Sequence, residues 1–363
     1  MLAEKLSSVL DVFQTKSPSL IGLDISSTSL KLVELSDAGK GTYRLERYCI
    51  EGLPKDLVTD GNIANLDQVS DALKRAWKRL GSRNRNLALA LPAAMVITKK
   101  IIVPSGQRDE DLELTVEAEA NQYIPFALDE VNLDFQVLGP APNNPEEVEI
   151  LIAASRKEKV EDRVAVAEAA GLKPRVMDVE SYATQEALRL IAPSLPASGR
   201  DQNIALVDIG AHVTHFYVLR NNLFLFSRDQ AFGGNQLTQD IQRAFNLSAE
   251  EAESAKKNQG LPENYDSDVL QPFMETLALE VTRALQFFFT STSYNQVDQI
   301  ILAGGCALLP GLDELVSKRA GISTIIANPF VNMQSSDRIR PRQIAQDAPL
   351  LLIACGLALR SFE

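Results

Sequence analysis

The sequence predicts an α/β protein with two similar lobes, because one short pattern occurs twice and a third β-prone run ends in paired glycines. In the first copy, an apolar run brings Asp24 to a turn of serine and threonine residues, and a second β-prone run leads away. In the second copy, Asp208 occupies the same place, and the third run ends at Gly304-Gly305. Such turns direct backbone N–H groups and hydroxyls at phosphate oxygens, while an aspartate orients a hydrated Mg²⁺. The duplication therefore predicts two lobes that close on one ligand.

The composition is that of a globular protein and excludes some function classes. With 363 residues, 45% of them apolar and 23% charged, the chain is long enough for two lobes. The formal net charge of −12 argues against a nucleic-acid surface, which relies on clustered lysine and arginine. The basic stretch 74–79 is predicted to be the solvated face of a helix. Cys49, Cys306 and Cys355 are widely spaced and odd in number, which favours reduced thiols over disulfides or a zinc site.

No segment is predicted to span a membrane. The longest apolar run, residues 348–359, is shorter than the roughly 20 residues that a spanning helix needs, and no secretory signal is visible. Residues 2–13 place apolar side chains at helical spacing, but the segment lacks a cationic face that would favour anionic lipid. Membrane contact is therefore expected only through a partner.

The first lobe is predicted to begin with a β-hairpin. Residues 20–35 and 42–50 alternate like strands around the turn-forming residues 37–41. Residues 67–80 have apolar positions at helical spacing, and a strand over 86–91 stops at a proline.

A compact block follows, which we expect to be a small α/β domain inserted in the first lobe. Its middle is an acidic helix, and a turn rich in proline and asparagine separates two later strands. The predicted elements are a strand over 95–103, a helix over 109–123, strands over 131–138 and 148–155 around the turn 139–145, and a helix over 157–170.

The second lobe is predicted to begin after a Pro/Ser/Gly connection at 193–199, which follows a helix over 178–190. After the Asp208 strand pair and a turn at Gly233-Gly234, a helical stretch runs to about residue 295. The remaining predicted elements are a strand over 299–303, a helix after it, and a closing apolar helix over 349–360.

These elements predict four subdomains. They are a first lobe of 20–92, 171–198 and 338–363, an inserted subdomain of 93–170, a second lobe of 199–239 and 297–337, and a helical subdomain of 240–296.

Four features of the sequence resemble those of the superfamily of actin, sugar kinases and heat-shock chaperone ATPases. They are Asp24 with Lys31 seven residues later, Asp208-x-Gly210 with Thr214, the Gly304-Gly305 turn, and the helices that start at 178 and 349. Their order covers nearly the whole chain and implies an actin-like, two-lobed fold of duplicated ribonuclease H-like units. Three narrower segments, 24–35, 121–126 and 233–238, resemble the PilM family of pilus assembly proteins and its relative FtsA.

The resemblance implies a function. PilM-like proteins are cytoplasmic, nucleotide-binding components of the type IV pilus assembly platform, held at the inner face of the inner membrane through a partner. They bind the N-terminal cytoplasmic tail of the membrane protein PilN in a groove beside the inserted domain. The implied cofactors are ATP and Mg²⁺, with pilus motor ATPases and further copies of the chain as other expected partners. An FtsA-like membrane tether is the alternative, followed by a small-molecule kinase, for which no substrate constellation is visible.

The resemblance also assigns roles in the first loop. Asp24 corresponds to the residue that holds Mg²⁺ through water, and Ser26, Ser27 and Thr28 to the groups that bind the β- and γ-phosphates. Lys31 would meet phosphate as a point cation. The alternatives are a serine-rich hairpin turn and a surface lysine.

In the second loop, Asp208, Gly210 and Thr214 match the family pattern, and Asp208 is the second expected Mg²⁺ residue. Ala211 and His212 stand where actin-like enzymes with strong turnover have an acidic residue or glycine, so we expect weak or no ATPase activity. His212 remains a nucleotide-loop candidate, although it and His215 would point to opposite faces of a strand and not share a metal ion.

Other candidates are Glu180, for positioning the attacking water, and residues on the adenosine side. Glu180 has an alternative role as a helix N-terminal acid stabilised by the dipole. The adenosine-side candidates are Gly233, Gly234, Glu253, Lys256, Gly304, Gly305 and Leu308. Glu253 and Lys256 form, alternatively, an ordinary surface pair.

In the inserted block, Tyr123, Pro125 and Phe126 end a helix and are candidates for bounding a groove that takes an extended apolar peptide. Their alternative place is the core of the block.

Overall fold

A computed structural model provides the structure, which describes residues 19–141, 144–258 and 260–362. The chain divides into two compact units, described separately below. The first unit contains Met1–Leu35, Cys49–Tyr182 and Leu357–Glu363, and the second contains Ser36–Tyr48 and Ala183–Gly356. The amphipathic segment predicted within residues 2–13 lies outside the described residues.

A mixed sheet has the strand order β10-β6-β1-β2-β3-β16, and its strands β1, β6 and β10 belong to the first unit. In β1 and β6 nearly every residue is buried, which explains their continuous apolar sequences, because parallel strands of this kind are covered on both faces. β1 pairs in parallel with β6, β6 with β10, and β1 is antiparallel to β2. The bounds are Ile21–Ile25 for β1, Ser29–Gly39 for β2, Thr42–Gly52 for β3, Asn86–Leu91 for β6, Lys173–Val179 for β10 and Gln334–Ser335 for β16.

Helices α2 (Leu66–Leu80) and α4 (Lys157–Ala169) cover the core of the first unit. The α2 helix begins where the Asn65 side chain accepts a hydrogen bond from the Gln68 N–H, and it ends at Gly81 in the left-handed conformation. A short hairpin of β4 (Val58–Thr59) and β5 (Asn62–Ile63) precedes α2.

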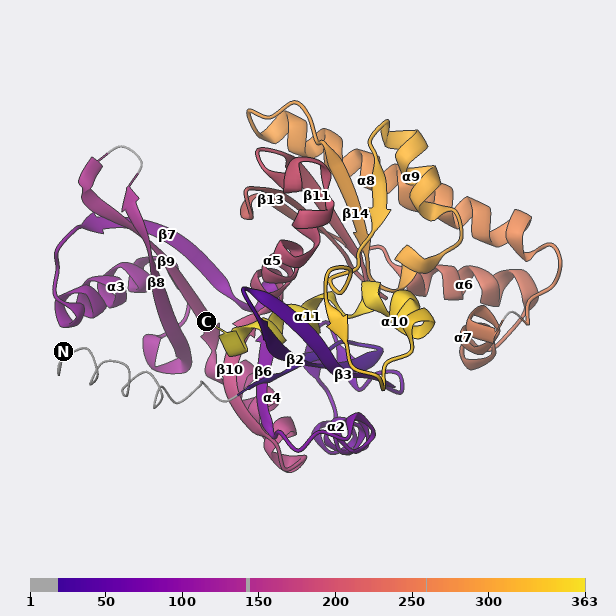
Figure 1. The fold of residues 1–363 in the computed structure, drawn as a ribbon, viewed down its shortest axis with the longest axis horizontal. Helices are drawn as coiled ribbons and strands as arrows, with labels where there is room; N and C mark the ends of the chain where they lie inside the picture. Colours follow the sequence, from indigo (N-terminus) through magenta and orange to yellow (C-terminus); the bar gives the residue numbers. More distant parts are fainter. Residues whose placement is uncertain (1–18, 142–143, 259, 363) are drawn as a thin grey trace, which may run out of the picture. The chain divides into compact units, whose positions relative to one another are not determined.

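The inserted block contains its own three-stranded sheet, in the order β7-β9-β8 (Figure 1). Its strands are β7 (Ile97–Pro104), β8 (Val131–Ala141) and β9 (Asn144–Arg156), and the short helix η3 (Leu128–Glu130) precedes β8. The predicted helix over 109–123 is confirmed as α3 (Asp109–Tyr123), which buries Val116 and Ala120 in the core of this sheet. β8 and β9 extend closer to the turn between them than the predicted bounds of 131–138 and 148–155. The buried residues Val166 and Ala167 of α4 pack in the core of the first unit.

The second unit is built on a five-stranded sheet in the order β13-β12-β11-β14-β15. Its central strand β11 pairs antiparallel with β12 and parallel with β14. The bounds are Asn203–Ile209 for β11, Thr214–Arg220 for β12, Leu223–Gln230 for β13, Gln299–Ala303 for β14 and Thr324–Ile326 for β15.

Apolar clusters cover both faces of this sheet. The larger cluster contains buried residues of α6, α8 and α9, whereas residues of α5 and α11 contribute to the smaller one. The helices are α5 (Glu180–Ile191), α6 (Gly234–Phe245), α7 (Ala249–Asn258), α8 (Gln271–Ser291), α9 (Leu312–Ala320), α10 (Pro341–Asp347) and α11 (Leu352–Leu359). The shorter helical turns are η2 (Ala93–Met95), η4 (Ala192–Ser194), η5 (Pro196–Gly199), η6 (Asp266–Leu270), η7 (Gly305–Leu308), η8 (Ala348–Leu350) and η9 (Arg360–Phe362).

Two helix predictions need correction. The helix expected from residue 178 begins at Glu180, because residues 173–179 form β10 and pair with β6. The closing helix expected over 349–360 is interrupted at Leu351, between η8 and α11.

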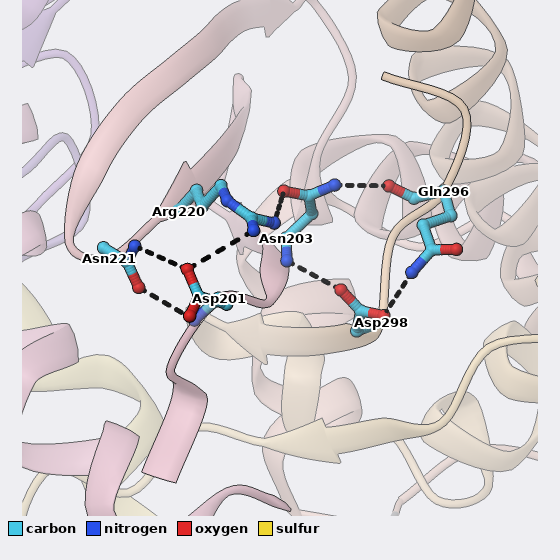
Figure 2. A network of polar contacts seen from close by, with 6 residues as sticks. All are labelled: Asp201, Asn203, Arg220, Asn221, Gln296 and Asp298. Atoms are coloured by element: carbon cyan, nitrogen blue, oxygen red, sulfur yellow. Dashed lines mark hydrogen bonds and ion pairs between the residues drawn. The ribbon is translucent and has the colours of Figure 1, made fainter. Parts of the chain in front are cut away.

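A polar network joins the first residue of β11, the last residue of β12 and the residues just before β14 (Figure 2). Buried Asn203 is at its centre: its side-chain amide donates to the Gln296 carbonyl at 2.9 Å, and its Oδ1 accepts from Arg220 at 3.3 Å. The other members of the network are Asp201, Asn221 and Asp298.

Within the described residues, no single helix is long and apolar enough to cross a membrane. The pair Pro341–Leu350 and Leu352–Phe362 reaches that length and composition only when taken together, across a 90° bend.

Candidate functional site

The first loop connects β1 to β2 and holds a buried ion pair. Ile25 pairs with Leu30, so the chain reverses over residues 26–29, and Ser26 stabilises the reversal by donating its N–H to the Ser29 carbonyl at 3.0 Å. This register places Asp24 directly opposite Lys31. The Lys31 Nζ donates to Asp24 Oδ2 at 2.7 Å and to Ser26 Oγ at 3.1 Å.

Burial decides how these charges behave. Asp24 is 3% exposed and Lys31 8% exposed, which is incompatible with the alternative of a surface lysine. A buried carboxylate and a buried ammonium each need a partner of opposite charge, and here each is the partner of the other. Ser27 is half-buried and Thr28 exposed at the tip of the turn.

Glu180 begins α5 at the end of β10. Because β1, β6 and β10 are parallel, with Leu23 level with Leu89 and Asp178 level with Ala90, the carboxyl ends of these strands meet at one edge of the sheet. Asp24 and Glu180 are therefore at the same edge. In open α/β sheets this edge is where ligands bind.

The second loop, in the other unit, repeats the geometry of the first. Ile209 pairs with Thr214, and Asp208 stands opposite His215. Gly210 donates its N–H to the Val213 carbonyl at 3.0 Å, and a Cβ at Gly210 would lie 2.7 Å from that oxygen.

The outer residues of this turn differ in exposure. His212 is exposed, whereas Thr214 is buried and its hydroxyl donates to the Phe232 carbonyl at 2.7 Å. The ring of His215 contacts Asp229 at 2.7 Å. Among the residues that the structure describes, no group of three or more His, Cys, Asp or Glu side chains could hold a metal ion directly.

Three glycines surround this turn, and two of them, Gly233 and Gly304, approach it so closely that no side chain would fit. A Cβ at Gly304 would lie 2.3 Å from the Ile209 carbonyl oxygen and 2.6 Å from Asp208 Oδ1, and a Cβ at Gly233 would lie 2.5 Å from the Gly210 oxygen. Gly234 donates its N–H to that same oxygen at 3.0 Å. The structure therefore brings Gly233, Gly234 and Gly304 together around the Asp208 loop, as a backbone cradle.

Gly305 and Leu308 are exposed beside this cradle, and no atom lies within 4 Å of a Cβ built at Gly305. Glu253 and Lys256 are more than a surface pair. They lie 2.6 Å apart, and each contacts the hydroxyl of buried Thr238 at 2.8 Å.

The buried Cys306 thiol lies close to this cluster, because a Cβ at Gly234 would come within 2.9 Å of its Sγ. Burial raises the pKa of Cys306 to about 11, which the positive charge of Lys256 partly opposes.

The first unit also contains a pocket of about 440 Å³ between the inserted sheet and the β4–β5 hairpin. Pro125 and Phe126 line it, and Arg156 stacks on the Phe126 ring at 4.6 Å. Tyr123 is not among the lining residues; it is 46% exposed, with Lys99 over its ring. The other lining residues are Asp60, Asn62, Ala94, Met95, Ile97, Ile124, Val131, Ala154, Ser155, Arg156 and Lys159.

Comparison with known proteins identifies the family. The sequence over residues 22–362 matches the protein family described as type IV pilus assembly protein PilM. The chain belongs to the PilM family. A solved structure described as a PilM-PilN type IV pilus biogenesis complex is 30% identical, with a TM-score of 0.79 over 96% of this chain and 99% of that chain.

Two more distant proteins are also similar to the chain. The cell division protein FtsA of Enterococcus hirae is 23% identical over 359 residues, which cover 86% of this chain and 79% of that protein. The ethanolamine utilization protein EutJ of Carboxydothermus hydrogenoformans shares the fold, with 18% identity and a TM-score of 0.58 over 99% of both chains. The predicted fold class is confirmed: this PilM family member has an actin-like fold with a small α/β subdomain inserted in its first part.

Sequence reasoning missed the part of the pocket that comes from the β4–β5 hairpin. Asp60 and Asn62 both line the pocket, and Asn62 Oδ1 is a buried acceptor without a hydrogen-bond partner among the described residues. The dipeptide Asp60-Gly61 is a signal for a tight hairpin turn and could have located the hairpin. Nothing local indicated that the hairpin would face the helical turn η2, which lies more than 30 residues later and contains Met95.

Proposed function

We propose that this PilM family member is an ATP-binding adaptor of the type IV pilus assembly platform, which binds the N-terminal cytoplasmic tail of PilN. The observation that carries the adaptor role is the pocket beside the inserted sheet, which has an apolar lining and an unsatisfied acceptor. The solved relative described as a PilM-PilN complex supports PilN as the partner.

The nucleotide-binding half of the proposal rests on the glycine cradle around Asp208. Gly304 and Gly305 allow close approach of a ligand to the backbone, and the half-buried Asp208 is suited to hold Mg²⁺ through water. Bound magnesium would neutralise phosphate charge. Exposed Leu308 is our candidate for contact with a base, and Glu253, which already contacts Lys256 and Thr238, is our candidate for contact with ribose hydroxyls.

The first loop is proposed to bind phosphate through its hydroxyls, its N–H groups and Lys31. The pair of Lys31 and Asp24 is already formed, so the loop has a cation for phosphate and a carboxylate for hydrated Mg²⁺ without rearrangement of the strands. Ser26, Ser27 and Thr28 form the turn between these residues. Glu180 is at the same edge of the sheet and is our proposal for positioning water.

The pocket is proposed to take an apolar side chain of the peptide. Its volume of about 440 Å³ and its lining by Phe126, Met95 and Ile97 suit such an anchor. Asn62 Oδ1 would accept a hydrogen bond from a peptide N–H, because a buried acceptor without a partner is costly. Pro125 forms part of the wall.

We propose that hydrolysis is slow or absent, so that nucleotide acts as a structural ligand or switch. Ala211 and exposed His212 give the second loop no additional acid for ordering an attacking water. Phosphate release at ordinary enzyme rates, on the order of 1 to 1,000 per second, would contradict this.

Cellular context completes the proposal. The protein would lie in the cytoplasm at the inner face of the inner membrane, held there through PilN, with motor ATPases and further copies of the chain as other partners. The four predicted subdomains remain our proposal for how the chain is organised. Sedimentation with liposomes in the absence of PilN would instead support an FtsA-like tether.

Calorimetric titration tests the proposal directly. A synthetic peptide of the PilN tail from the same organism is titrated into the protein with and without ATP and Mg²⁺, and ATP is titrated alone. Asp24→Ala and Asp208→Ala should each weaken ATP binding at least tenfold, a loss of about 1.4 kcal/mol or more. The control Asp229→Ala removes a carboxylate outside the turn, paired with His215, and should leave ATP affinity unchanged. No measurable peptide binding in any nucleotide state would refute the adaptor role, and unchanged ATP affinity in Asp208→Ala would refute the loop assignment.

A further inference from the structure

Arg163 on α4 is a buried arginine for which sequence reasoning gave no role. It is 1% exposed and is the largest of the fully buried side chains. Its Nε donates to the Ala90 carbonyl at 2.9 Å, and its Nη2 donates to the Gly61 carbonyl at 2.8 Å. Among the described residues no carboxylate forms an ion pair with it, although buried arginines ordinarily have one.

The first contact ties Arg163 to the edge of the sheet at which phosphate binding is proposed. Ala90 is level with Asp178 and follows Leu89, which is level with Leu23, so the carbonyl that Arg163 binds is beside the ends of β1 and β10. Burial lowers the pKa of Arg163, while the negative charges of Glu180, Asp162 and Asp24 raise it. Carboxylates at this edge therefore stabilise the guanidinium from a distance.

The second contact ties Arg163 to the wall of the pocket. Gly61 and Asp60 are both in the left-handed conformation, at the tip of the β4–β5 hairpin. Asp60 and Asn62, on either side of Gly61, line the pocket. A Cβ at Gly61 would lie 3.1 Å from the end of Met95, another lining residue, so the tip is packed against the pocket with no spare space.

We propose that Arg163 is a positioning residue that couples the nucleotide edge of the first unit to the peptide pocket. A triphosphate at the carboxyl ends of β1, β6 and β10 adds negative charge and stabilises the buried guanidinium. The position in which Arg163 bonds both Ala90 and Gly61 is then favoured over positions in which the hairpin tip is released, and this preorganises the wall formed by Asp60 and Asn62. Because coupling between two binding equilibria is reciprocal, the peptide strengthens nucleotide binding by the same factor.

This inference rests on the proposed function, and its test separates the two. The PilN tail peptide is titrated into the protein with and without saturating AMP-PNP and Mg²⁺. In the wild type, nucleotide should tighten peptide binding by about fivefold or more, which is the lower range of known couplings. In Arg163→Met, both ligands should still bind, with a ratio of peptide affinities near one. Arg163→Lys keeps the charge but loses the simultaneous hydrogen bonds to Ala90 and Gly61, so its ratio of peptide affinities with and without nucleotide should also fall.

Arg108→Met is the matched control, because Arg108 is exposed at the start of α3 and pairs with Asp111, away from the pocket lining. Its ratio should equal that of the wild type. If the wild type binds neither ligand, the proposed function fails and the inference fails with it. If the wild type binds both ligands without coupling, or Arg163→Met keeps the coupling, the inference alone is overturned.

A second measurement on the wild type covers the case in which Arg163→Met does not fold. Hydrogen exchange of the amides in residues 58–63 should slow by about fivefold or more when AMP-PNP and Mg²⁺ bind. Unchanged exchange in this hairpin, at nucleotide concentrations that saturate the protein, would overturn the coupling.

Discussion

Replacing Gly304 with alanine should disrupt the second loop, because the structure leaves no room for a methyl group there. Gly304 has φ 80° and ψ 178°, a backbone region that is essentially restricted to glycine. A Cβ would also lie 2.3 Å from the Ile209 carbonyl oxygen and 2.6 Å from Asp208 Oδ1. The first of these is a backbone atom in a central strand and cannot move aside cheaply.

The magnitude follows from two terms. The backbone conformation costs an alanine about 1 to 3 kcal/mol, and forcing an extra methyl group into a packed region costs about 1 to 3 kcal/mol. Since the chain must relieve part of the overlap by shifting, we expect a loss of about 2 to 4 kcal/mol in the free energy of unfolding of the second unit. For a unit of this size that corresponds to a fall of roughly 4 to 16 °C in its melting temperature.

The neighbouring glycine provides the control. Gly305 has nothing within 4 Å of its Cβ position and no positive φ, so Gly305→Ala should melt like the wild type. The assay is thermal unfolding followed by calorimetry, together with ATP titration below the transition. Gly304→Ala should lose stability and ATP affinity together, because the backbone shift that relieves the overlap moves residue 304 away from Asp208 and Ile209. Equal melting temperatures for both variants, or an equal loss in both, would refute the reasoning.

Three further results are expected. Asn203→Ala should lower the free energy of unfolding by about 1 to 3 kcal/mol in denaturant titrations, since it leaves the Gln296 carbonyl without its donor. The thiol of Cys306, with its pKa raised from 9.0 to about 11 by burial, should react with iodoacetamide about 100-fold more slowly in the native than in the unfolded protein near pH 8. The contribution of the Cys306 thiol to the free energy of unfolding is complete below about pH 9 and is lost as the pH rises through 11. Between these pH values the folded state retains a proton that the unfolded state has released. Phe126→Ala should weaken binding of the PilN tail peptide at least tenfold in titrations, whereas Tyr123→Ala, which alters a side chain outside the pocket lining, should change it less than twofold.

Much of the fold could be predicted, because its signals are local. The acidic helix of the insert has the predicted bounds Asp109–Tyr123. β14 has the predicted bounds Gln299–Ala303 and ends at the glycine pair, since glycine readily adopts a conformation that ends a strand. The contact between Asp24 and Lys31 was not predicted, although the antiparallel register of β1 and β2 places the two residues opposite each other.

The elements that were missed or misplaced lack a clear local signal. β10 leads directly into α5, so Asp178 near its end resembled the start of a helix. The strand conformation of β10 comes from its pairing with β6. β13 is an edge strand whose residues are mostly half-exposed, which weakens the apolar alternation that identifies a strand. The closing helix is interrupted beside Pro349, which lies in a separate short helical turn.

Candidate residues for the site could be named from the sequence, but their contacts and their electrostatics could not. The glycines around Asp208 could be named from the sequence, yet only the structure shows that their missing side chains allow the close approach. Arg163 resembled any other arginine on a helix, and its burial depends on Ala90 and Gly61, which come from two other parts of the chain. Burial of this kind is a tertiary property that local patterns do not encode.

The two aspartate loops share a register but differ in the residue opposite the aspartate, and burial explains the difference. In both loops, four residues lie between the last two paired residues, which are Ile25 and Leu30 in the first loop and Ile209 and Thr214 in the second. The aspartate directly precedes the first residue of that pair. Asp24 is almost fully buried, so its charge requires the ammonium of Lys31 at 2.7 Å. Asp208 is half-buried, and the residue opposite it is His215, whose ring is bonded to Asp229. The first loop therefore carries its own cation whether or not a ligand is bound. The second loop depends on the close approach of Gly304 instead, so a methyl group disrupts the second loop, whereas the loss of an ammonium would disrupt the first.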